Sequence, residues 1–364
     1  MNEFKVPLDR LDRRELLARV GDMSQLAGIR RSFVCDGRAR ELEALDIDTG
    51  GGLELCVLPG RGMDIAHAKY KGVPVSFITK AGLSSADAYE PCGMGWLRGF
   101  FGGLLTTCGL SNVGWVCDDD DPQLGEVHHG LHGRISHTGA QAVSYGAAWD
   151  AEGRYIIHAS GRMREGVLHG ENISLTRTIT TSLGSKAIAI HDEVENDGFV
   201  SRPLMILYHI NAGYPLLDEN SEMVLPSLAV SCSAESTGSP GSYNDFSPPV
   251  HEGEQYVYRH TLGDAGGKTK AGIINKALGY GLYVGFDKTQ LPNFMQWKRL
   301  SKGDYVVGLE PANCESVGRV ESKKRGELRY IEPGEKKCFE LVIGILDGEG
   351  EIGEFRKECA QLCK

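Results

Sequence analysis

The chain has 364 residues, of which 41% are hydrophobic and 24% are charged, a composition typical of a globular protein with a sizeable core. Acidic residues outnumber lysine and arginine by 49 to 39, and the net charge of −10 argues against a nucleic-acid partner, which requires a basic face. No stretch approaches about 18 consecutive apolar residues, so we expect no membrane span. The charged N-terminus lacks the apolar stretch of a secretory signal, and we therefore predict a cytoplasmic protein.

The predicted elements begin with one helix and continue with strands. Residues 10–20 carry Leu11, Leu16, Leu17 and Val20 on one side of a helix. Short segments rich in β-branched and aromatic residues then predict strands at 53–58, 155–160, 173–181, 187–194, 204–210, 282–286, 305–309 and 339–345. The segments 173–181 and 187–194 flank a glycine-containing turn, so we predict that they form a hairpin.

The order of these elements indicates a mainly β fold. Strands and helices do not alternate along the chain, which disfavours a doubly wound parallel sheet. Many short strands with glycine-rich turns favour a large antiparallel sandwich or barrel. Residues 231–253 are interpreted as a long excursion rather than a linker, because strands resume after them. We predict one domain over residues 1–364, with an N-terminal helical or extended segment (1–40) and a C-terminal helix (349–364).

Four histidines within ten positions form the densest cluster of unusual residues. His128, His129, His132 and His137 are interleaved with glycines. Imidazoles at such spacings can coordinate zinc, iron or manganese. His128 and His129 would point to opposite faces of a strand, however, and the glycines favour a turn. The cluster is therefore a metal site, a loop that binds a polar ligand, or a solvated surface.

Two apolar strands carry a titratable residue near their predicted ends. His209 comes late in the strand at 204–210, before Asn211, and Glu310 follows the strand at 305–309. Glu310 precedes a proline and is therefore held extended. A carboxylate near the core must be paired or have a shifted pKa. Either residue can also be structural, as a core histidine with one hydrogen bond or a carboxylate facing water.

A third segment joins an amide, an indole and an ammonium group. Gln296, Trp297 and Lys298 stand immediately before the strand that leads to Glu310. An indole face with polar donors suits a sugar, whose ring has an apolar C–H face and hydroxyl edges. The alternative is a core tryptophan between two surface polar residues.

Taken together, these segments resemble the aldose 1-epimerase, or galactose mutarotase-like, superfamily. His132-Gly133, His209 and Glu310 occur in the order found there. The segments 58–65, 208–215 and 296–298, with 308–311, are most similar to its branch grouped as domain of unknown function 4432. The resemblance covers roughly residues 53–345. It implies a β-supersandwich of two large antiparallel sheets with a few short helices and a sugar in an open cleft.

The resemblance also implies roles for individual residues. His209 would be the general acid that protonates the ring oxygen, and Glu310 the base that deprotonates the anomeric hydroxyl. Such chemistry needs an ionised glutamate and a protonated histidine, each stabilising the other. His132 would help to hold the sugar.

The chain departs from the superfamily pattern at other positions that would contact the sugar. Met63-Asp64 stands where mutarotases usually carry Asn-Arg, so Arg61, with Arg134 behind it, becomes the candidate arginine contact. Gln296 is the candidate replacement for the carboxylate that binds distal hydroxyls. We count Asp64, Asn211, Trp297 and Lys298 among the predicted substrate-binding residues as well.

Three hypotheses follow from these observations. The leading one is an aldose 1-epimerase-like isomerase without cofactor or metal, acting on a monosaccharide or sugar acid as a monomer or homodimer. The second is a carbohydrate-binding protein or sugar sensor on the same fold, without catalysis. The third is a metal-dependent sugar isomerase that uses the histidines at 128–137.

Overall fold

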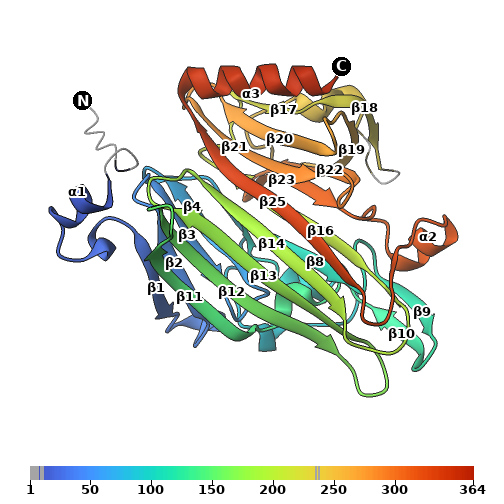
Figure 1. The fold of residues 1–364 in the computed structure, drawn as a ribbon. Coiled ribbons are helices and arrows are strands. Elements are labelled where there is room, and N and C mark those ends of the chain that lie inside the picture. Colours follow the sequence, from blue (N-terminus) through green and yellow to red (C-terminus); the bar gives the residue numbers. More distant parts are fainter. Residues whose placement is uncertain (1–7, 9–11, 234–235, 237) are drawn as a thin grey trace.

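A computed structural model describes residue 8, residues 12–233, residue 236 and residues 238–364. Strands make up most of the ordered elements, and all strand pairs in the named sheets are antiparallel (Figure 1). The predicted mainly β class is therefore confirmed.

Two sheets are much larger than the others. The larger contains, in spatial order, β11 (Gln141–Trp149), β12 (Tyr155–Gly166), β13 (Asn172–Ser182), β14 (Ala187–Asn196), β25 (Lys336–Asp347), β21 (Tyr280–Asp287), β20 (Lys268–Asn275) and β17 (Ser221–Val224). The second, six-stranded sheet contains β18 (Ser227–Cys232), β19 (Gln255–Leu262), β22 (Asn293–Ser301), β23 (Asp304–Ala312), β16 (Met205–Gly213) and β8 (Thr106–Leu110).

Smaller sheets and a few helices complete the structure. The N-terminal sheet contains β1 (Gly28–Phe33), β2 (Glu43–Asp48), β3 (Leu53–Leu58), β4 (Asp64–Tyr70) and β5 (Val73–Pro74). Two-stranded pairs are β6 (Phe77–Ile78) with β7 (Gly102–Gly103), β9 (Cys117–Asp121) with β10 (Gly125–His129), and β15 (Arg202–Pro203) with β24 (Tyr330–Ile331). The α-helices are α1 (Arg13–Leu17), α2 (Arg319–Lys324) and α3 (Gly348–Leu362), and 3₁₀ turns are η2 (Met23–Gln25), η3 (Gly37–Ala39), η4 (Ala86–Ala88), η5 (Gly95–Arg98), η6 (Ile135–His137) and η7 (Pro240–Asn244).

The main hydrophobic core joins the two large sheets and the N-terminal sheet. Alternate side chains of β16, among them Ile206, Tyr208 and Ile210, belong to this core together with Ile188 and Ile190 of β14. The intervening side chains of β16 point to the other face of the six-stranded sheet, because successive residues of a strand alternate in direction. A second apolar cluster on that outer face contains Met205 and Leu207. The six-stranded sheet is thus covered on both faces.

Most predicted strands are present, with shifted ends. β3 has the predicted bounds, and β13 and β14 form the predicted hairpin. The strand predicted at 204–210 continues to Gly213, and that at 305–309 continues to Ala312, so His209 and Glu310 lie within strands and not at their ends.

The predicted N-terminal helix is shorter than expected. α1 starts after Asp12, whose side chain accepts a hydrogen bond from the backbone N–H of Glu15, a capping interaction that fixes the first turn. Leu16 and Val20 are buried, but Leu17, which was predicted on the same side of the helix, is exposed. Residues 10 and 11 of the prediction lie outside the described residues.

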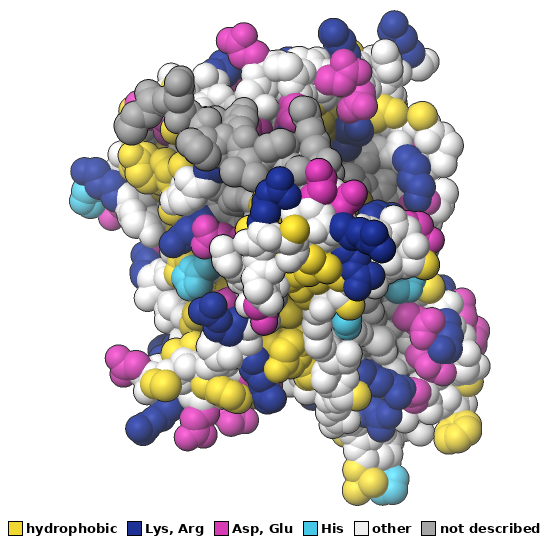
Figure 2. Space-filling model, turned by 60° about the vertical axis from the view of Figure 1, so that its left-hand side comes forward, with side chains coloured by type: hydrophobic (Ala, Val, Ile, Leu, Met, Phe, Trp, Pro, Cys, Tyr) yellow, Lys and Arg dark blue, Asp and Glu magenta, His cyan; other side chains and the backbone are white. Residues whose placement is uncertain are grey.

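Basic and acidic side chains are interspersed on the face shown in Figure 2, and hydrophobic side chains form a band near its middle. This face therefore carries no continuous basic surface. Within the described part of the chain, no helix is both long and apolar enough to cross a membrane.

Candidate functional site

A cavity of about 400 Å³ lies on the outer face of the six-stranded sheet. Side chains of β16, β19, β22 and β23 form its floor, and segments 94–100 and 114–132 and the region of α2 form its sides. Its lining includes Trp96, Phe100, Trp115, His132, His209, Arg259, Trp297 and Glu310.

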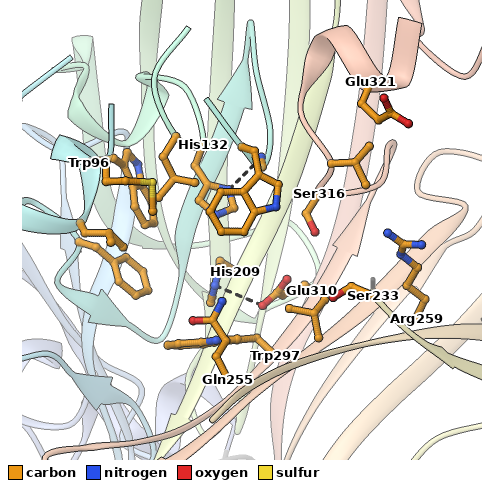
Figure 3. Close-up of a pocket in the computed structure, with 18 of the residues that line it drawn as sticks. Trp96, His132, His209, Ser233, Gln255, Arg259, Trp297, Glu310, Ser316 and Glu321 are labelled. Atoms are coloured by element: carbon orange, nitrogen blue, oxygen red, sulfur yellow. Dashed lines mark hydrogen bonds and ion pairs between the residues drawn. The ribbon is translucent and has the colours of Figure 1, made fainter. Parts of the chain in front are cut away.

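His209 and Glu310 face each other at the floor of the cavity (Figure 3). They lie on β16 and β23, whose antiparallel register pairs Ile210 with Leu309. The same register sets His209 opposite Glu310, with both side chains on one face of the sheet. Nε2 of His209 is 3.2 Å from Oε1 of Glu310. The fold thus brings two titratable groups from distant parts of the chain into contact.

Burial favours the neutral form of each member of this pair. The side chains of His209 and Glu310 are only 7% and 4% exposed. Burial lowers the pKa of His209 to about 3, and His132 acts in the same direction; burial raises the pKa of Glu310 to about 8. The expected imidazolium and carboxylate are thus replaced by a neutral imidazole and a carboxylic acid. Both arrangements hold one proton, and the contact allows that proton to lie on either group.

Gly308 makes room for the pair. It lies opposite Trp297 in the register of β22 and β23. A Cβ atom at Gly308 would lie 2.5 Å from Oε1 of Glu310 and 3.2 Å from both Cε1 of His209 and Cβ of Trp297. The missing side chain therefore lets the indole, the imidazole and the carboxyl group meet at one point of the floor.

His132 approaches the cavity from a strained turn. Its φ is +55°, and the next residue, Gly133, has a φ of +69°. A Cβ atom at Gly133 would lie 2.2 Å from the carbonyl oxygen of Gly109, so only glycine allows this turn to pack against β8. The backbone N–H of Gly114 donates to Nδ1 of His132 at 3.3 Å. Burial lowers the pKa of His132 to about 4, and a neutral imidazole that accepts at Nδ1 carries its proton on Nε2.

Aromatic rings surround the His209–Glu310 pair. The ring centroids of Trp96 and Phe100 are 4.6 Å apart. The imidazole of His209 lies 5.2 Å from Phe100 and 5.3 Å from Trp297. Apolar ring faces beside two proton-transfer groups form a site that can hold the C–H face of a sugar next to an acid and a base.

Two predicted contact residues, Arg61 and Asp64, lie outside the cavity lining. Arg61 is fully buried, and its guanidinium donates to backbone oxygens of three segments, those of Ser84, Gly99 and Ser136. Asp64 accepts from the backbone N–H and hydroxyl of Thr107 and pairs with Arg177 at 3.0 Å. Both residues hold segments around the cavity together, so no group on them is left for a ligand.

The two neighbours of Trp297 point away from the cavity. Gln296 and Lys298 lie on the opposite face of β22, because side chains alternate along a strand. Nε2 of Gln296 donates to the carbonyl oxygen of Tyr243 at 2.8 Å, and Nζ of Lys298 donates to that of Asp245 at 2.9 Å. These side chains fix the segment that contains η7.

Asn211 and Arg134 also lie outside the lining. Nδ2 of Asn211 donates to the carbonyl oxygens of Gly102, at 3.1 Å, and His209, at 2.8 Å. The charge of Arg134 acts on Glu165, where it opposes the rise in pKa to about 7 that burial causes. Of the ten predicted site residues, the cavity is therefore lined by His132, His209, Trp297 and Glu310.

The four clustered histidines point to four different surroundings. His128 contacts an aspartate of β9, and His129 lies on the other face of β10. His132 lines the cavity, while Nε2 of His137 is 3.1 Å from the guanidinium of Arg61. Across the described residues, no three His, Cys, Asp or Glu side chains are grouped so as to hold a metal ion. The geometry therefore gives no support to the metal hypothesis.

Sequence reasoning missed several residues of the site. Trp96, Phe100 and Trp115 lie in glycine-rich connections without periodicity, so no strand or helix pattern indicated their direction. Arg259 lies on β19, a strand that was not predicted. In the structure, Val257 and Arg259 alternate with the buried Tyr258, but Val257 and Tyr258 are both hydrophobic, so the sequence shows no period of two that would have placed Arg259 on the face opposite the core.

The fold is shared with solved structures of low sequence identity. A candidate aldose 1-epimerase from Klebsiella pneumoniae is 21% identical with a TM-score of 0.83, covering 94% of this chain and 91% of that one. A galactose mutarotase-like protein from Clostridium acetobutylicum is 15% identical with a TM-score of 0.59, covering 88% and 98%. A galactose 1-epimerase from Lactobacillus acidophilus is 12% identical with a TM-score of 0.59, covering 88% and 99%. The predicted galactose mutarotase-like fold is thus confirmed.

No curated protein matches the chain by sequence. A family model does match, over residues 39–345, which include all four predicted residues that line the cavity. The chain therefore belongs to the family described as domain of unknown function DUF4432.

Proposed function

We propose that this protein is an aldose 1-epimerase-like enzyme that interconverts the anomers of a monosaccharide or sugar acid by acid–base catalysis. The observation that carries the proposal is the contact of 3.2 Å between His209 and Glu310 at the floor of an aromatic-lined cavity. The cavity volume of about 400 Å³ lies in the range of small-molecule sites. The epimerase names of two proteins with the same fold also support it.

The His209–Glu310 pair can supply the one proton donor and the one proton acceptor that anomer exchange requires. Opening a cyclic hemiacetal removes a proton from the anomeric hydroxyl and delivers one to the ring oxygen. When the one proton of the pair lies on His209, Glu310 takes the first proton and His209 supplies the second, and the two groups exchange roles when the ring closes on the other face. Because the pair holds one proton, one member can donate while the other accepts.

The surrounding side chains hold the sugar. The indole of Trp297 offers an apolar face beside His209, and Phe100, which is stacked on Trp96, lies beside the same imidazole. Nε2–H of His132 is a hydrogen-bond donor for a sugar hydroxyl. These contacts position the anomeric carbon at the pair, which supplies part of the rate enhancement.

We expect the purified protein to accelerate anomer exchange of at least one aldose or sugar acid, with a rate that falls as pH rises through about 8. Above that pH, Glu310 loses the shared proton and the neutral imidazole has none to donate. A second proton is gained only near pH 3, so the rate is expected to stay level between these limits. Polarimetry and NMR saturation transfer over a panel of sugars measure both effects. Sugar binding without acceleration would instead favour the non-catalytic alternative.

Replacing Gly308 by alanine is expected to lower the exchange rate by about 10²-fold while the fold persists. The new Cβ would displace the end of the flexible Glu310 side chain rather than backbone, and a displacement of about 1 Å at a reacting group has this effect on rate. Gly285→Ala is the matched control, because a Cβ there approaches only the carbonyl oxygen of Thr269, at 3.8 Å. Exchange rates and thermal unfolding of both variants are compared. An unchanged rate in the Gly308 variant would show that the pair tolerates displacement and would count against its proposed role.

A further inference from the structure

The register of the six-stranded sheet sets Arg259 in line with the His209–Glu310 pair. Glu310 lies opposite Met295 in the pairing of β23 with β22, and Met295 lies opposite Arg259 in the pairing of β22 with β19. Directly opposed residues point to the same face, so the four side chains form one row on the face that carries the cavity, in which Met295 is buried and lies outside the cavity lining. Neighbouring strands lie about 4.8 Å apart, which places the backbone of Arg259 about 10 Å from that of Glu310.

Arg259 reaches the cavity with hydrogen-bond donors that are not all used. Its side chain is 26% exposed, and Nη2 is 3.3 Å from Oε2 of Glu315. Nε is buried and has no hydrogen-bond partner among the residues that the structure describes. Figure 3 shows Arg259 and Trp96 at opposite sides of the cavity, with the His209–Glu310 pair between them. A buried, unsatisfied donor of a cation needs an acceptor, and Arg259 is one of the residues that line the cavity.

The other charges at this end are already paired with one another. Arg325 contacts Glu315 at 3.1 Å and Glu321 at 2.9 Å. Glu321 and Glu310 are the acidic side chains among the described lining residues, and burial keeps Glu310 neutral below about pH 8. Glu315 is shared by two guanidinium groups, so it neutralises Arg259 only in part. The two guanidinium groups thus balance the two carboxylates of Glu315 and Glu321, and an additional anion would be held by the unused donor of Arg259 rather than by excess positive charge.

We propose that the substrate is an anionic sugar whose acidic group binds Arg259 while its anomeric carbon lies at the His209–Glu310 pair. The placement of the anomeric carbon rests on the function proposed above. The sugar ring then lies in the cavity between the two ends of the row. An arginine fork binds a carboxylate or phosphoryl group through paired, charge-assisted hydrogen bonds, which a neutral hydroxymethyl group cannot provide.

Binding of matched sugar pairs tests this assignment. Titration calorimetry on the full chain compares glucuronate and galacturonate with glucose and galactose, and glucose 6-phosphate with glucose. We expect the anionic member of at least one pair to bind more tightly by about 10-fold or more. Arg259→Gln is expected to weaken that binding by about 10- to 100-fold and to change neutral-sugar binding by less than about twofold. Arg259→Lys should retain part of the preference, because it keeps the charge but loses the fork.

Arg162→Gln is the matched control, since Arg162 is a partly exposed arginine paired with Asp197 on the eight-stranded sheet. It should leave every affinity unchanged. Equal affinity for anionic and neutral sugars, no binding of any probe, or an equal loss of both in Arg259→Gln overturns the proposal. If Arg259→Gln does not fold, the wild-type preference and Arg259→Lys decide. Tighter binding of the uronates assigns a carboxylate, and that of the sugar phosphate assigns a phosphoryl group.

The proposed catalysis and this inference can fail separately. An anionic sugar that binds through Arg259 but is not exchanged faster than in water supports the inference and contradicts the enzyme. Faster exchange of neutral aldoses, with no preference for acids, supports the enzyme and overturns the inference.

Discussion

Replacing Glu310 by glutamine is expected to slow catalysed anomer exchange by about 10²–10⁴-fold, the usual contribution of a general acid–base group. Glutamine has nearly the shape of the protonated carboxyl group, so it keeps the packing around His209, but it cannot pass the shared proton to or from a substrate. The expected loss is therefore in kcat, with a small change in substrate affinity. NMR saturation transfer on the active sugar measures the exchange rate directly.

The same variant is expected to remain folded and to lose part of the pH dependence of stability. Burial raises the pKa of Glu310 from 4.5 to about 8, so the folded protein binds this proton more tightly than the unfolded chain does. The resulting stabilisation is fully present below pH 4.5 and is lost as pH rises to about 8. Urea unfolding of wild type and Glu310→Gln at pH 5 and pH 8 should show a smaller difference between the two pH values in the variant.

Glu165 provides a matched control for this experiment. It is also a buried glutamate whose pKa is raised by burial, to about 7, but it lies outside the cavity lining and accepts from the backbone N–H of Leu110. Glutamine at this position can accept the same hydrogen bond. Glu165→Gln should therefore exchange anomers within about threefold of wild type, a small effect for a substitution away from reacting groups. Wild-type exchange rates in Glu310→Gln would remove Glu310 from the mechanism.

Segments rich in β-branched and aromatic residues, several of them with alternating polar residues, predicted half of the strands in the two large sheets. β14 shows the alternation clearly, since Ile188 and Ile190 are buried while Ala189 between them and His191 after them are exposed. In a strand with one covered face, hydrophobic and polar residues alternate along the sequence. The six-stranded sheet is covered on both faces, and every residue of β16 is buried. There the pattern gives a strand but not the face to which each side chain points.

Because the sequence pattern does not show to which face a side chain points, only some of the predicted site residues line the cavity. Motif order led to His132, His209, Trp297 and Glu310, all of which line the cavity. Proximity in sequence also led to Gln296 and Lys298, which the strand directs away from Trp297. Arg61 and Asp64 are polar residues in a marked motif, but their partners, such as Arg177, lie far away in the chain. Whether a polar side chain binds a ligand or a buried backbone group depends on these tertiary contacts, which no local pattern encodes.

Asp64, which was predicted to bind substrate, instead belongs to a buried ion network between the sheets. Arg177 of β13 donates to both carboxylate oxygens of Asp192, at 2.9 and 2.6 Å, and to Asp64 at 3.0 Å. The hydroxyl of Tyr208, the neighbour of His209, also donates to Asp192 at 2.7 Å. The guanidinium and both carboxyl groups are fully buried. The network thus links β13 and β14 of one large sheet to the strand that carries His209.

Replacing Arg177 by methionine is expected to lower the free energy of unfolding by about 3–5 kcal/mol, because it leaves two buried carboxyl groups without their cation. Asp64 can relieve part of this cost by binding a proton, since burial already raises its pKa to about 6. The variant should therefore be less destabilised at pH 5 than at pH 8. Urea unfolding followed by circular dichroism at both pH values measures the change.

Two further variants test whether the lower stability of Arg177→Met comes from the buried carboxylates that lose their cation or simply from the loss of an arginine side chain. Arg162→Met removes a partly exposed arginine from its pair with Asp197 and is expected to cost about 1 kcal/mol or less. Adding Asp64→Asn and Asp192→Asn to Arg177→Met should recover stability, because the uncompensated charges disappear even though fewer hydrogen bonds remain. If the triple variant is less stable than Arg177→Met alone, directional hydrogen bonds to the carboxylates, rather than charge balance, hold β16 and its histidine against the larger sheet.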